Sequence, residues 1–448
     1  MNDTIAAIST TTGIGAISII RLSGPESLKI ASKVFTKDLT KVETHTIHYG
    51  YIKNNNDKID EVLVSVMKAP KTFTKEDIVE INCHGGIATT NKVLEILLNN
   101  GARLAEPGEF TKRAFLNGRI DLLEAEATMD LISSKSEKAR KISLNTLTGE
   151  TSNLIKDLRS DIVGIISNIE VNIDYPEYED IEVLTNEKIL PDIKKFKKKL
   201  EQIIKKSEDS KVIKEGIKVG IIGKPNVGKS SLLNSLLEEE KAIVTNVPGT
   251  TRDIVEGTII LDNVILNIID TAGIRESNDI VEKMGIEKSL AIINEADLVI
   301  FILNNSERIT KEEKELLEKL KDKKKIIVIN KIDLESKLDK SVLDNYIEIS
   351  AKENIGIEKI KNEIKRLFNL GELETSDLTY MSNARSISLL QKSLSNINES
   401  INEINNNSPI DIVEFHLKDA WNNLGEIIGE TYTDELLDEL FSRFCLGK

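Results

Sequence analysis

Eight residues near the middle of the chain, GKPNVGKS at positions 223–230, have the types and spacing of a phosphate-binding loop. They fit the pattern G-x-x-x-x-G-K-[ST], in which backbone N–H groups wrap a phosphate chain. The apolar run Ile217–Ile222 precedes the loop, and a helical pattern begins at Ser231. A helix that starts there adds unpaired N–H groups and the positive end of its dipole. A glycine turn without a ligand is the alternative interpretation of this loop taken alone.

Three later segments supply the remaining chemistry of a nucleotide site. DTAG at 270–273 ends the apolar run Val264–Ile269, and a carboxylate at a strand end suits a magnesium ion beside the γ-phosphate. NKID at 330–333 follows another apolar run, and its aspartate can accept hydrogen bonds from a donor pair of guanine that adenine lacks. SAK at 350–352 can donate a backbone N–H to the guanine oxygen. Four loops at four strand ends, in this order, resemble those of guanine-specific P-loop GTPases.

The predicted GTP-binding residues lie in these four loops and in a switch segment between them. Lys229 is expected at the β- and γ-phosphates, and the hydroxyl of Ser230 at magnesium. The full set is Asn226, Val227, Gly228, Lys229, Ser230, Ser231, Thr245, Asn246, Val247, Pro248, Gly249, Thr250, Thr251, Asp270, Thr271, Ala272, Gly273, Asn330, Lys331, Asp333, Ser350, Ala351 and Lys352.

The residue after DTAG departs from a common pattern. Many small GTPases place a glutamine there to orient the attacking water, whereas this chain has Ile274, which cannot form a side-chain hydrogen bond. Arg252 and Arg275 lie in switch-like segments, but either could equally pair with local acids. The residues alone therefore identify neither the group that positions water nor an arginine finger.

Length and composition predict a multidomain protein. A chain of 448 residues is too long for one core, so two to four domains are expected. Two cysteines cannot form a disulfide framework or a zinc site by themselves, which fits a reducing cytosol. The acidic N-terminus argues against a secretory signal, and the absence of 18 consecutive apolar residues argues against a membrane span. A net charge of −14 produces an overall electrostatic field that disfavours strong binding of RNA to the chain.

The predicted fold class is multidomain α/β plus α. Residues 1–118 read as a mixed α/β domain, with short apolar runs at 15–22, 45–52, 62–67 and 78–81 and helices at 88–99 and 109–116. A long helical pattern then covers 119–172, the acidic segment 174–180 breaks it at a proline, and a lysine-rich helix spans 186–208.

The Ras-like GTPase domain is expected at 211–370. Further helices are expected at 371–448, where helical patterns cover 382–405 and 410–443. The second helical part has few large apolar side chains, so it makes a poor independent core. We therefore expect it to pack with the helices of 119–210, which would make the GTPase domain an insertion in a helical domain. A separate C-terminal helical hairpin is the alternative.

Short segments along the whole chain narrow the superfamily to one family. FCLGK at 444–448 matches the ending of the MnmE (TrmE) tRNA-modification GTPases. The segments at 3–7, 20–24, 79–86, 105–118, 248–253 and 281–287 are similar to that family as well. The chain thus resembles the MnmE (TrmE) family over essentially its whole length.

This resemblance implies a homodimeric, potassium-dependent GTPase. The N-terminal domain of the family dimerises and binds a one-carbon derivative of tetrahydrofolate, either 5-formyl- or methylene-tetrahydrofolate. With the flavoprotein MnmG (GidA), in a heterotetramer or larger complex, the family modifies C5 of the wobble uridine of certain tRNAs with a carboxymethylaminomethyl-type group. The cofactors so implied are Mg²⁺, K⁺ and the folate, and the implied location is the cytoplasm, with no membrane partner.

The resemblance also implies roles for particular residues. Glu282 would position the attacking water. Ser230 and Thr251 would bind magnesium, whereas potassium would be bound by Asn226 together with Thr245, Val247 and Thr250. The folate positions would be Arg21, Glu80, Arg119 and Lys448, and Cys445 would have a catalytic role. Arginine stands at 119 where lysine is common in the family, which keeps the charge but changes the donor geometry. Cys83 is expected to be structural.

Two other functions compete with this interpretation. An Era-like ribosome-assembly GTPase would need an RNA-binding module with basic flanks, and none follows residue 352. A GTP-switched scaffold without one-carbon chemistry would not need the charged folate positions at both ends of the chain.

Overall fold

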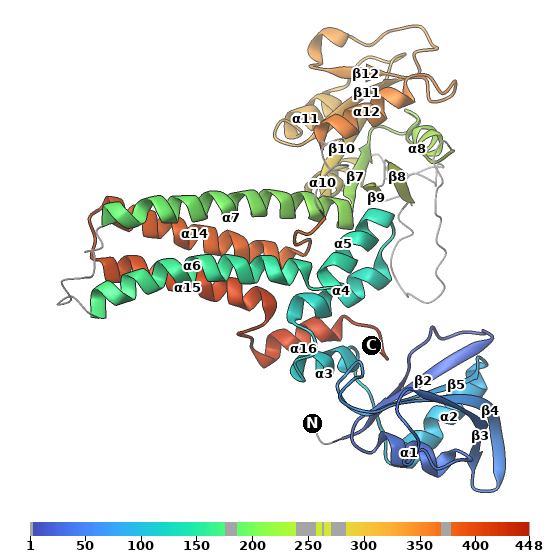
Figure 1. The fold of residues 1–448 in the computed structure, drawn as a ribbon. Coiled ribbons are helices and arrows are strands. Elements are labelled where there is room, and N and C mark those ends of the chain that lie inside the picture. The colour runs from blue at the N-terminus through green and yellow to red at the C-terminus, as the bar shows by residue number, and fades with distance from the viewer. Residues whose placement is uncertain are drawn as a thin grey trace. The chain divides into compact units, whose positions relative to one another are not determined.

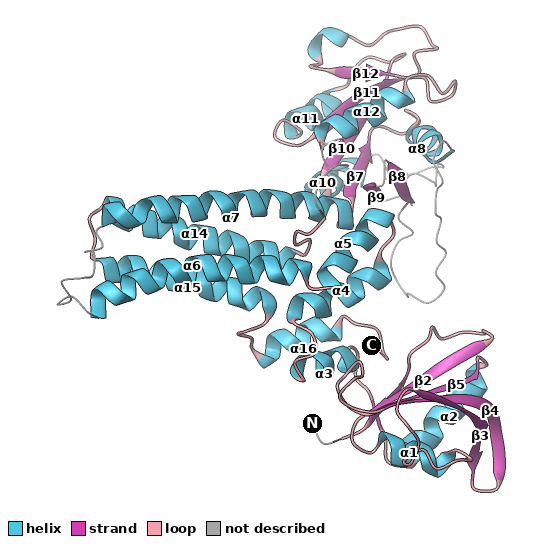
Figure 2. Ribbon diagram, in the orientation of Figure 1, coloured by secondary structure: helices cyan, strands magenta, loops and turns pink. Residues whose placement is uncertain are grey.

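The computed structural model describes residues 3–174, 186–238, 257–261, 264–269, 284–368 and 378–447 (Figure 1). The chain divides into two compact units. Met1–Met129, Leu147–Ile193 and Ser395–Lys448 form the first, and Asp130–Thr146 with Lys194–Leu394 form the second. Each unit contains one six-stranded sheet and several helices, so the predicted fold class is confirmed (Figure 2). The predicted domain boundaries at 118, 210 and 370 stay a prediction.

The N-terminal sheet has the strand order β3-β4-β5-β2-β1-β6, and only β1 and β6 pair in parallel among its described strands. Alternating buried residues of the strands pack against α1 and α2, which cover one face. Its elements are β1 (Ile5–Ile8), β2 (Ile17–Ser23), α1 (Ser27–Val34), β3 (Thr46–Asn54), β4 (Asp57–Met67), β5 (Ile78–His84), α2 (Ile87–Asn99) and β6 (Arg103–Leu104).

The first unit also contains helices from both ends of the chain. α15 packs along α6, and α16 packs against α3. The helices that follow the N-terminal sheet and precede the second six-stranded sheet in the sequence are α3 (Glu109–Leu116), α4 (Leu122–Ser133), α5 (Glu137–Leu147), α6 (Glu150–Asp174) and α7 (Asn186–Glu215). Those after it are α14 (Ala384–Asn405), α15 (Ile410–Ile428) and α16 (Asp434–Ser442). The division between the two units falls within α4, α7 and α14 and before the last residue of α5. None of the helices in the described ranges is both long and apolar enough to cross a lipid bilayer.

Two helical segments are more broken than their hydrophobic pattern predicts. Residues 119–172 form three helices. Ser134 Oγ donates to the carbonyl of Asp130 at the end of α4 and competes with the continuing backbone hydrogen bonds, and Gly149, with φ +86°, lies between α5 and α6. Residues 410–443 form two helices separated at Gly429, which has φ +79°. A Cβ at Gly429 would lie 2.9 Å from side-chain atoms of Leu122 and Phe115, so both backbone conformation and packing require glycine.

The GTPase sheet has the order β12-β11-β10-β7-β9-β8 and is parallel except for β8. Buried residues of α8 and α12 cover one face, and those of α10 and α11 cover the other. Its strands are β7 (Ile217–Ile222), β8 (Gly257–Leu261), β9 (Val264–Ile269), β10 (Leu298–Asn304), β11 (Lys325–Asn330) and β12 (Tyr346–Glu348). Its helices are α8 (Lys229–Glu238), α10 (Met284–Glu295), α11 (Lys311–Lys319), the 3₁₀ helix η1 (Lys340–Val342) and α12 (Ile357–Leu367). Because β7, β11 and β12 are parallel, the loops that follow them lie at the same edge.

Candidate functional site

The phosphate-binding loop connects β7 to α8 as predicted, and its backbone takes left-handed conformations at several positions. Asn226 has φ +60°, a region that asparagine enters more readily than most residues. Gly228 has φ +100°, and a Cβ there would lie 2.1 Å from Nδ2 of Asn330. The glycine is therefore required by the close approach of the loop at the end of β11.

Lys229 lies across the inside of this loop. Its Nζ donates hydrogen bonds to the carbonyls of Gly223 and Lys224, each over 2.7 Å. Burial lowers the pKa of the Lys229 ammonium. An ammonium that burial has partly removed from water is stabilised by a nearby anion, so its position suits a phosphate.

Asn330 joins the phosphate loop to the two loops predicted to bind guanine. Its Nδ2 donates to the carbonyl of Val227 over 2.8 Å, and its Oδ1 accepts from the N–H of Ala351 over 3.0 Å. The residue is 2% exposed, so both hydrogen bonds are shielded from water. This single side chain thus fixes the relative positions of three loops.

Asp333 is exposed at the same edge of the sheet and accepts a hydrogen bond from Ser350 Oγ over 2.7 Å. That hydrogen bond lowers the pKa of the Asp333 carboxyl, with a smaller contribution from Lys352. An ionised carboxylate with a second oxygen is the acceptor that the guanine donors need. The structure therefore brings together the predicted residues of the 226–231, 330–333 and 350–352 loops.

The remaining predicted nucleotide and metal residues lie outside the described residues. They are Thr245, Asn246, Val247, Pro248, Gly249, Thr250, Thr251, Asp270, Thr271, Ala272, Gly273 and the predicted water-positioning Glu282. Ser230, in the first turn of α8, contributes a hydroxyl oxygen, and Asn226 contributes an amide oxygen. Oxygen donors of this kind suit Mg²⁺ and K⁺, so the described part of the donor set fits the predicted ions.

In the N-terminal domain, two of the four predicted folate residues, Arg21 and Arg119, lie over one aromatic ring, and a third, Glu80, pairs with Arg21. Arg21 Nε lies 2.8 Å from Glu80 Oε1, and the two residues are direct partners between β2 and β5. The Arg21 guanidinium lies 5.9 Å from the ring centroid of Phe73, and that of Arg119 lies 4.9 Å from the same centroid. Phe73 was missed by the sequence analysis, because a lone aromatic in a loop has no periodic neighbours to indicate its role.

The C-terminal segment docks on this domain. Ser9 Oγ donates to the carbonyl of Gly447 over 3.1 Å, and the N–H of Gly108 donates to the carbonyl of Cys445 over 3.4 Å. Ser9 directly follows β1, which pairs with the strand that carries Arg21. Cys445 is exposed, whereas Lys448 lies outside the described residues.

The other cysteine, Cys83, is 2% exposed in the core of the N-terminal sheet. Burial raises the pKa of its thiol, which keeps it protonated. A protonated, enclosed thiol fits the structural role expected for Cys83.

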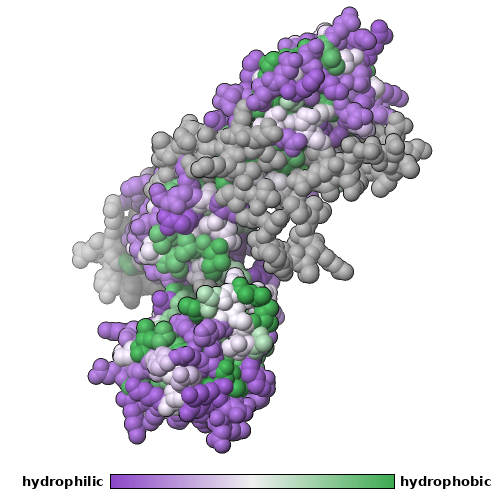
Figure 3. Space-filling view, turned by 90° about the vertical axis from the view of Figure 1, so that its right-hand side faces the viewer, coloured by the Kyte–Doolittle hydropathy of each residue, from purple (hydrophilic) through white to green (hydrophobic). Residues whose placement is uncertain are grey.

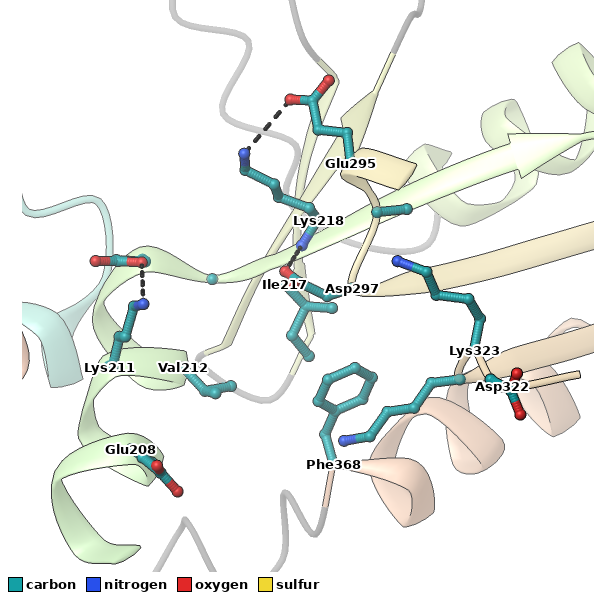
Figure 4. Close-up of a pocket in the computed structure, with 14 residues that line it drawn as sticks. Glu208, Lys211, Val212, Ile217, Lys218, Glu295, Asp297, Asp322, Lys323 and Phe368 are labelled. Carbon is teal, nitrogen blue, oxygen red and sulfur yellow. Dashed lines mark hydrogen bonds and ion pairs between the residues drawn. The ribbon is translucent and has the colours of Figure 1, made fainter. Parts of the chain in front are cut away.

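A cavity of about 630 Å³ lies at the opposite edge of the GTPase sheet, where α7 meets the start of β7 (Figure 4). Charged side chains line much of it, including Lys218, which lies 3.4 Å from Glu295, and Lys211, which lies 3.8 Å from Glu215. None of the predicted site residues lines this cavity. It is therefore separate from the nucleotide-binding edge.

Comparisons with known proteins match two family models to the chain. The family model described as the MnmE helical domain matches residues 122–445, and that described as the N-terminus of the GTP-binding protein TrmE matches residues 4–119. The chain is 50% identical over 457 residues to the tRNA modification GTPase MnmE of Enterococcus faecalis, covering 100% of this chain and 98% of that protein.

Two further comparisons cover different lengths of the chain. The protein of the same name from Ligilactobacillus salivarius is 51% identical over 456 residues, again covering 100% of this chain and 98% of the relative. The solved G domain of the FeoB iron transporter of T. maritima is 28% identical, with a TM-score of 0.25, covering 34% of this chain and 98% of that structure. That TM-score is too low to support a conclusion.

Proposed function

Because this chain belongs to the MnmE (TrmE) family of tRNA modification GTPases, we propose that it uses potassium-dependent GTP hydrolysis to modify C5 of the wobble uridine of certain tRNAs. Membership of the family makes it a GTPase that acts in tRNA modification. The proposed one-carbon donor is 5-formyl- or methylene-tetrahydrofolate, and the product carries a carboxymethylaminomethyl-type group. The proposed partner is the flavoprotein MnmG (GidA), in a heterotetramer or larger complex, in the cytoplasm where tRNA is modified.

The observation that carries the folate part of this proposal is the cluster of Arg21, Glu80 and Arg119. Arg21 and Glu80 present donors beside a carboxylate acceptor, which is the pairing that the edge of a pterin requires. Arg119 adds an exposed cation for an oxygen or carboxylate of the ligand. The docked segment 444–447 supports the inclusion of Lys448, because the described chain ends beside Ser9 in the same domain.

The potassium part rests on Asn226. Its side chain is exposed in the phosphate loop and makes no hydrogen bond that involves the described residues. An amide oxygen that is not used elsewhere can bind a hard cation. A cation beside the β- and γ-phosphates neutralises charge that develops during phosphoryl transfer, as an arginine finger does in other GTPases.

The homodimer is supported by the outer face of the N-terminal sheet. Ile47 and Tyr49 of β3 are 67% and 64% exposed, and Leu63 of β4 lies opposite Tyr49 in the register. In Figure 3 this domain lies at the bottom of the view and shows apolar surface among hydrophilic surface. Ile47 pairs across the strands with Ser65 on β4, which pairs with Glu80 on β5, which in turn pairs with Arg21 on β2. A second copy on this face would therefore lie beside the proposed folate site.

The domain layout remains part of the proposal. The GTPase domain at 211–370 would be an insertion between two parts of a helical domain, 119–210 and 371–448. The packing of α15 along α6 supports this arrangement, since the two helices come from opposite sides of the insertion in the sequence.

Nucleoside analysis of tRNA tests the function directly. Cells that lack this protein should lose the C5 modification of wobble uridine, and complementation with the full chain should restore it. A ribosome-assembly defect with unchanged tRNA nucleosides would favour the Era-like alternative. Unchanged nucleosides together with normal ribosomes would favour a scaffold.

GTP turnover tests the chemistry of hydrolysis. Potassium should speed turnover far more than sodium in the natural chain, and Asn226→Ala should remove the difference. Glu282→Ala should abolish turnover while GTP binding survives, because the residue is proposed to act on water and not on the nucleotide. Glu287→Ala is a control, since it removes a nearby acid with no proposed role. Equal turnover in the two salts, or full activity of Glu282→Ala, would contradict these assignments.

A further inference from the structure

The loop between β4 and β5 holds Phe73 in a fixed place in the N-terminal domain. Thr72 Oγ1 donates to the carbonyl of Glu76 over 2.6 Å, which closes the loop on itself. Ser23 Oγ, on β2, donates to Glu76 Oε2 over 2.7 Å. Lys75 is in the left-handed region with φ +57°, a conformation that is unfavourable for a residue with a Cβ. A loop that keeps such a conformation is held by its surroundings.

The same loop is fastened to the turn that carries Arg119. Asn117 Nδ2 donates to the carbonyl of Thr74 over 2.6 Å, and Lys75 Nζ donates to the carbonyl of Gly118 over 2.8 Å. Both hydrogen bonds join residues that directly follow Phe73 to residues that directly precede Arg119. Movement of the loop would move Arg119 with it.

The Phe73 ring also has apolar neighbours that hold it in place. It packs against a small apolar cluster formed by Ile5, Ala7, Ala105 and Phe110 on the outer side of the sheet. Phe110 is fully buried, and its ring centroid lies 5.7 Å from the Arg21 guanidinium. Phe73 and Phe110 thus both contact the Arg21 guanidinium, and Phe73 also contacts that of Arg119.

The two arginines differ in how their charge is compensated. Arg21 is paired with Glu80. The exposed guanidinium of Arg119 makes no hydrogen bond or ion pair with any residue in the described ranges, and only a longer-range interaction with Glu124 accompanies its contact with Phe73. A guanidinium that lies over a ring contacts it through one face. Its N–H donors point outward in the plane of the guanidinium, where they can still reach a planar acceptor.

We propose that Phe73 is a positioning residue of the folate site, whose ring orients Arg119 and sets its spacing from the Arg21–Glu80 pair. This inference rests on the proposed folate function. The ligand group that Arg119 would take is a carboxylate or carbonyl oxygen. Lysine would keep the charge at position 119 but lacks a planar group that stacks, so Phe73 and Arg119 act as a matched pair in this chain.

The affinity of the full-length chain for 5-formyltetrahydrofolate, measured by isothermal titration calorimetry, tests the proposal. Phe73→Leu and Phe73→Met should bind about threefold to tenfold more weakly, while Phe73→Tyr, which keeps the ring, should bind normally. Phe415→Leu serves as the matched control, because it removes an exposed phenylalanine from α15. Melting temperatures and elution volumes identify any variant that is misfolded, and the methionine variant retains most of the packing volume if the leucine variant fails.

A double-mutant cycle tests whether Phe73 acts through Arg119. In an Arg119→Gln background the Phe73→Leu change should cost little further affinity, because coupled residues are not additive. Additive losses, or an unchanged affinity in Phe73→Leu, would overturn the proposal.

A readout without folate separates this inference from the proposed function. Phenylglyoxal modifies accessible guanidinium groups, and peptide mass spectrometry reports its rate at Arg119. Phe73→Leu should raise that rate by uncovering one face of the guanidinium, whereas Phe73→Tyr should not. Failure of the natural chain to bind folate would contradict the proposed function alone, and an unchanged rate at Arg119 would contradict the role of Phe73.

Discussion

Ser350 Oγ donates a hydrogen bond to Asp333 Oδ1 over 2.7 Å, and so links the two loops predicted to bind guanine. This bond is the main cause that holds the pKa of the exposed Asp333 carboxyl below its usual range. The carboxylate therefore stays ionised further into acid than an isolated aspartate would. Guanine recognition by Asp333 depends on that ionised form, because a protonated carboxyl loses part of its acceptor capacity.

Removal of the Ser350 hydroxyl should change the pH dependence of GTP binding. In Ser350→Ala the pKa of Asp333 rises toward its ordinary value, so GTP affinity is lost at a higher pH as the solution is acidified. Near neutral pH the variant and the natural chain should differ little. Titration of a fluorescent GTP analogue between about pH 3 and pH 6, a range that includes the ordinary aspartate pKa of about 3.9, measures the shift.

A matched control for this experiment exists elsewhere in the chain. Ser341 Oγ donates to Asp339 Oδ1 over 2.6 Å and lowers the pKa of that carboxyl in the same way. Ser341→Ala should leave the pH profile of GTP binding unchanged. Superimposable profiles for Ser350→Ala and the natural chain would disprove the coupling between Ser350 and nucleotide binding.

Asp333→Asn should weaken GTP binding and relax the preference for guanine. The amide keeps one oxygen acceptor but loses the negative charge that strengthens hydrogen bonds from guanine. Hydrogen bonds to charged groups are stronger than those between neutral groups, so we expect roughly a tenfold to hundredfold loss of affinity. Competition by ITP, which lacks the exocyclic amino group, measures the change in selectivity. Unchanged affinity and selectivity would remove Asp333 from the guanine site.

Asn330→Asp should destabilise the GTPase unit and weaken GTP binding together. The new carboxylate can still accept from Ala351 but cannot donate to the carbonyl of Val227, which is left unpaired in a buried position. A buried group without its partner costs about 1–3 kcal/mol. Chemical denaturation gives the change in unfolding free energy.

The control for Asn330→Asp is the same change at an exposed asparagine. Asn345 is exposed in a loop of the GTPase sheet, so Asn345→Asp should alter neither quantity. An Asn330→Asp protein with natural stability and GTP affinity would show that the bridge between the loops is dispensable.

Deletion of Lys448 should weaken binding of 5-formyltetrahydrofolate and leave GTP affinity nearly intact. The folate and nucleotide residues belong to different compact units, and changes at distant sites usually add independently. Lys448→Arg is the control, since it keeps a cation at the chain end. Loss of GTP binding in a folded deletion protein would contradict the separation of the two sites.

The sequence by itself determined the nucleotide loops and the family. The loop at 223–230 works through backbone N–H groups and residues within one turn of each other, so its pattern is visible in eight consecutive letters. The loops at 330–333 and 350–352 were found in the same way, because each follows an apolar run that had to be a strand. Their common edge then followed from the parallel order of the strands.

The tertiary structure decided how distant side chains meet. Asn330 contacts Val227 across 103 positions of sequence, and Ser9 contacts Gly447 across 438. Phe73 contacts both Arg21, which precedes it in the sequence, and Arg119, which follows it. No periodicity encodes such contacts, because they arise only when separate elements pack and one ring or amide fills the space between them. Residues 119–172 likewise break into three helices, at Ser134, whose hydroxyl donates to the carbonyl of Asp130, and at Gly149, which has φ +86°.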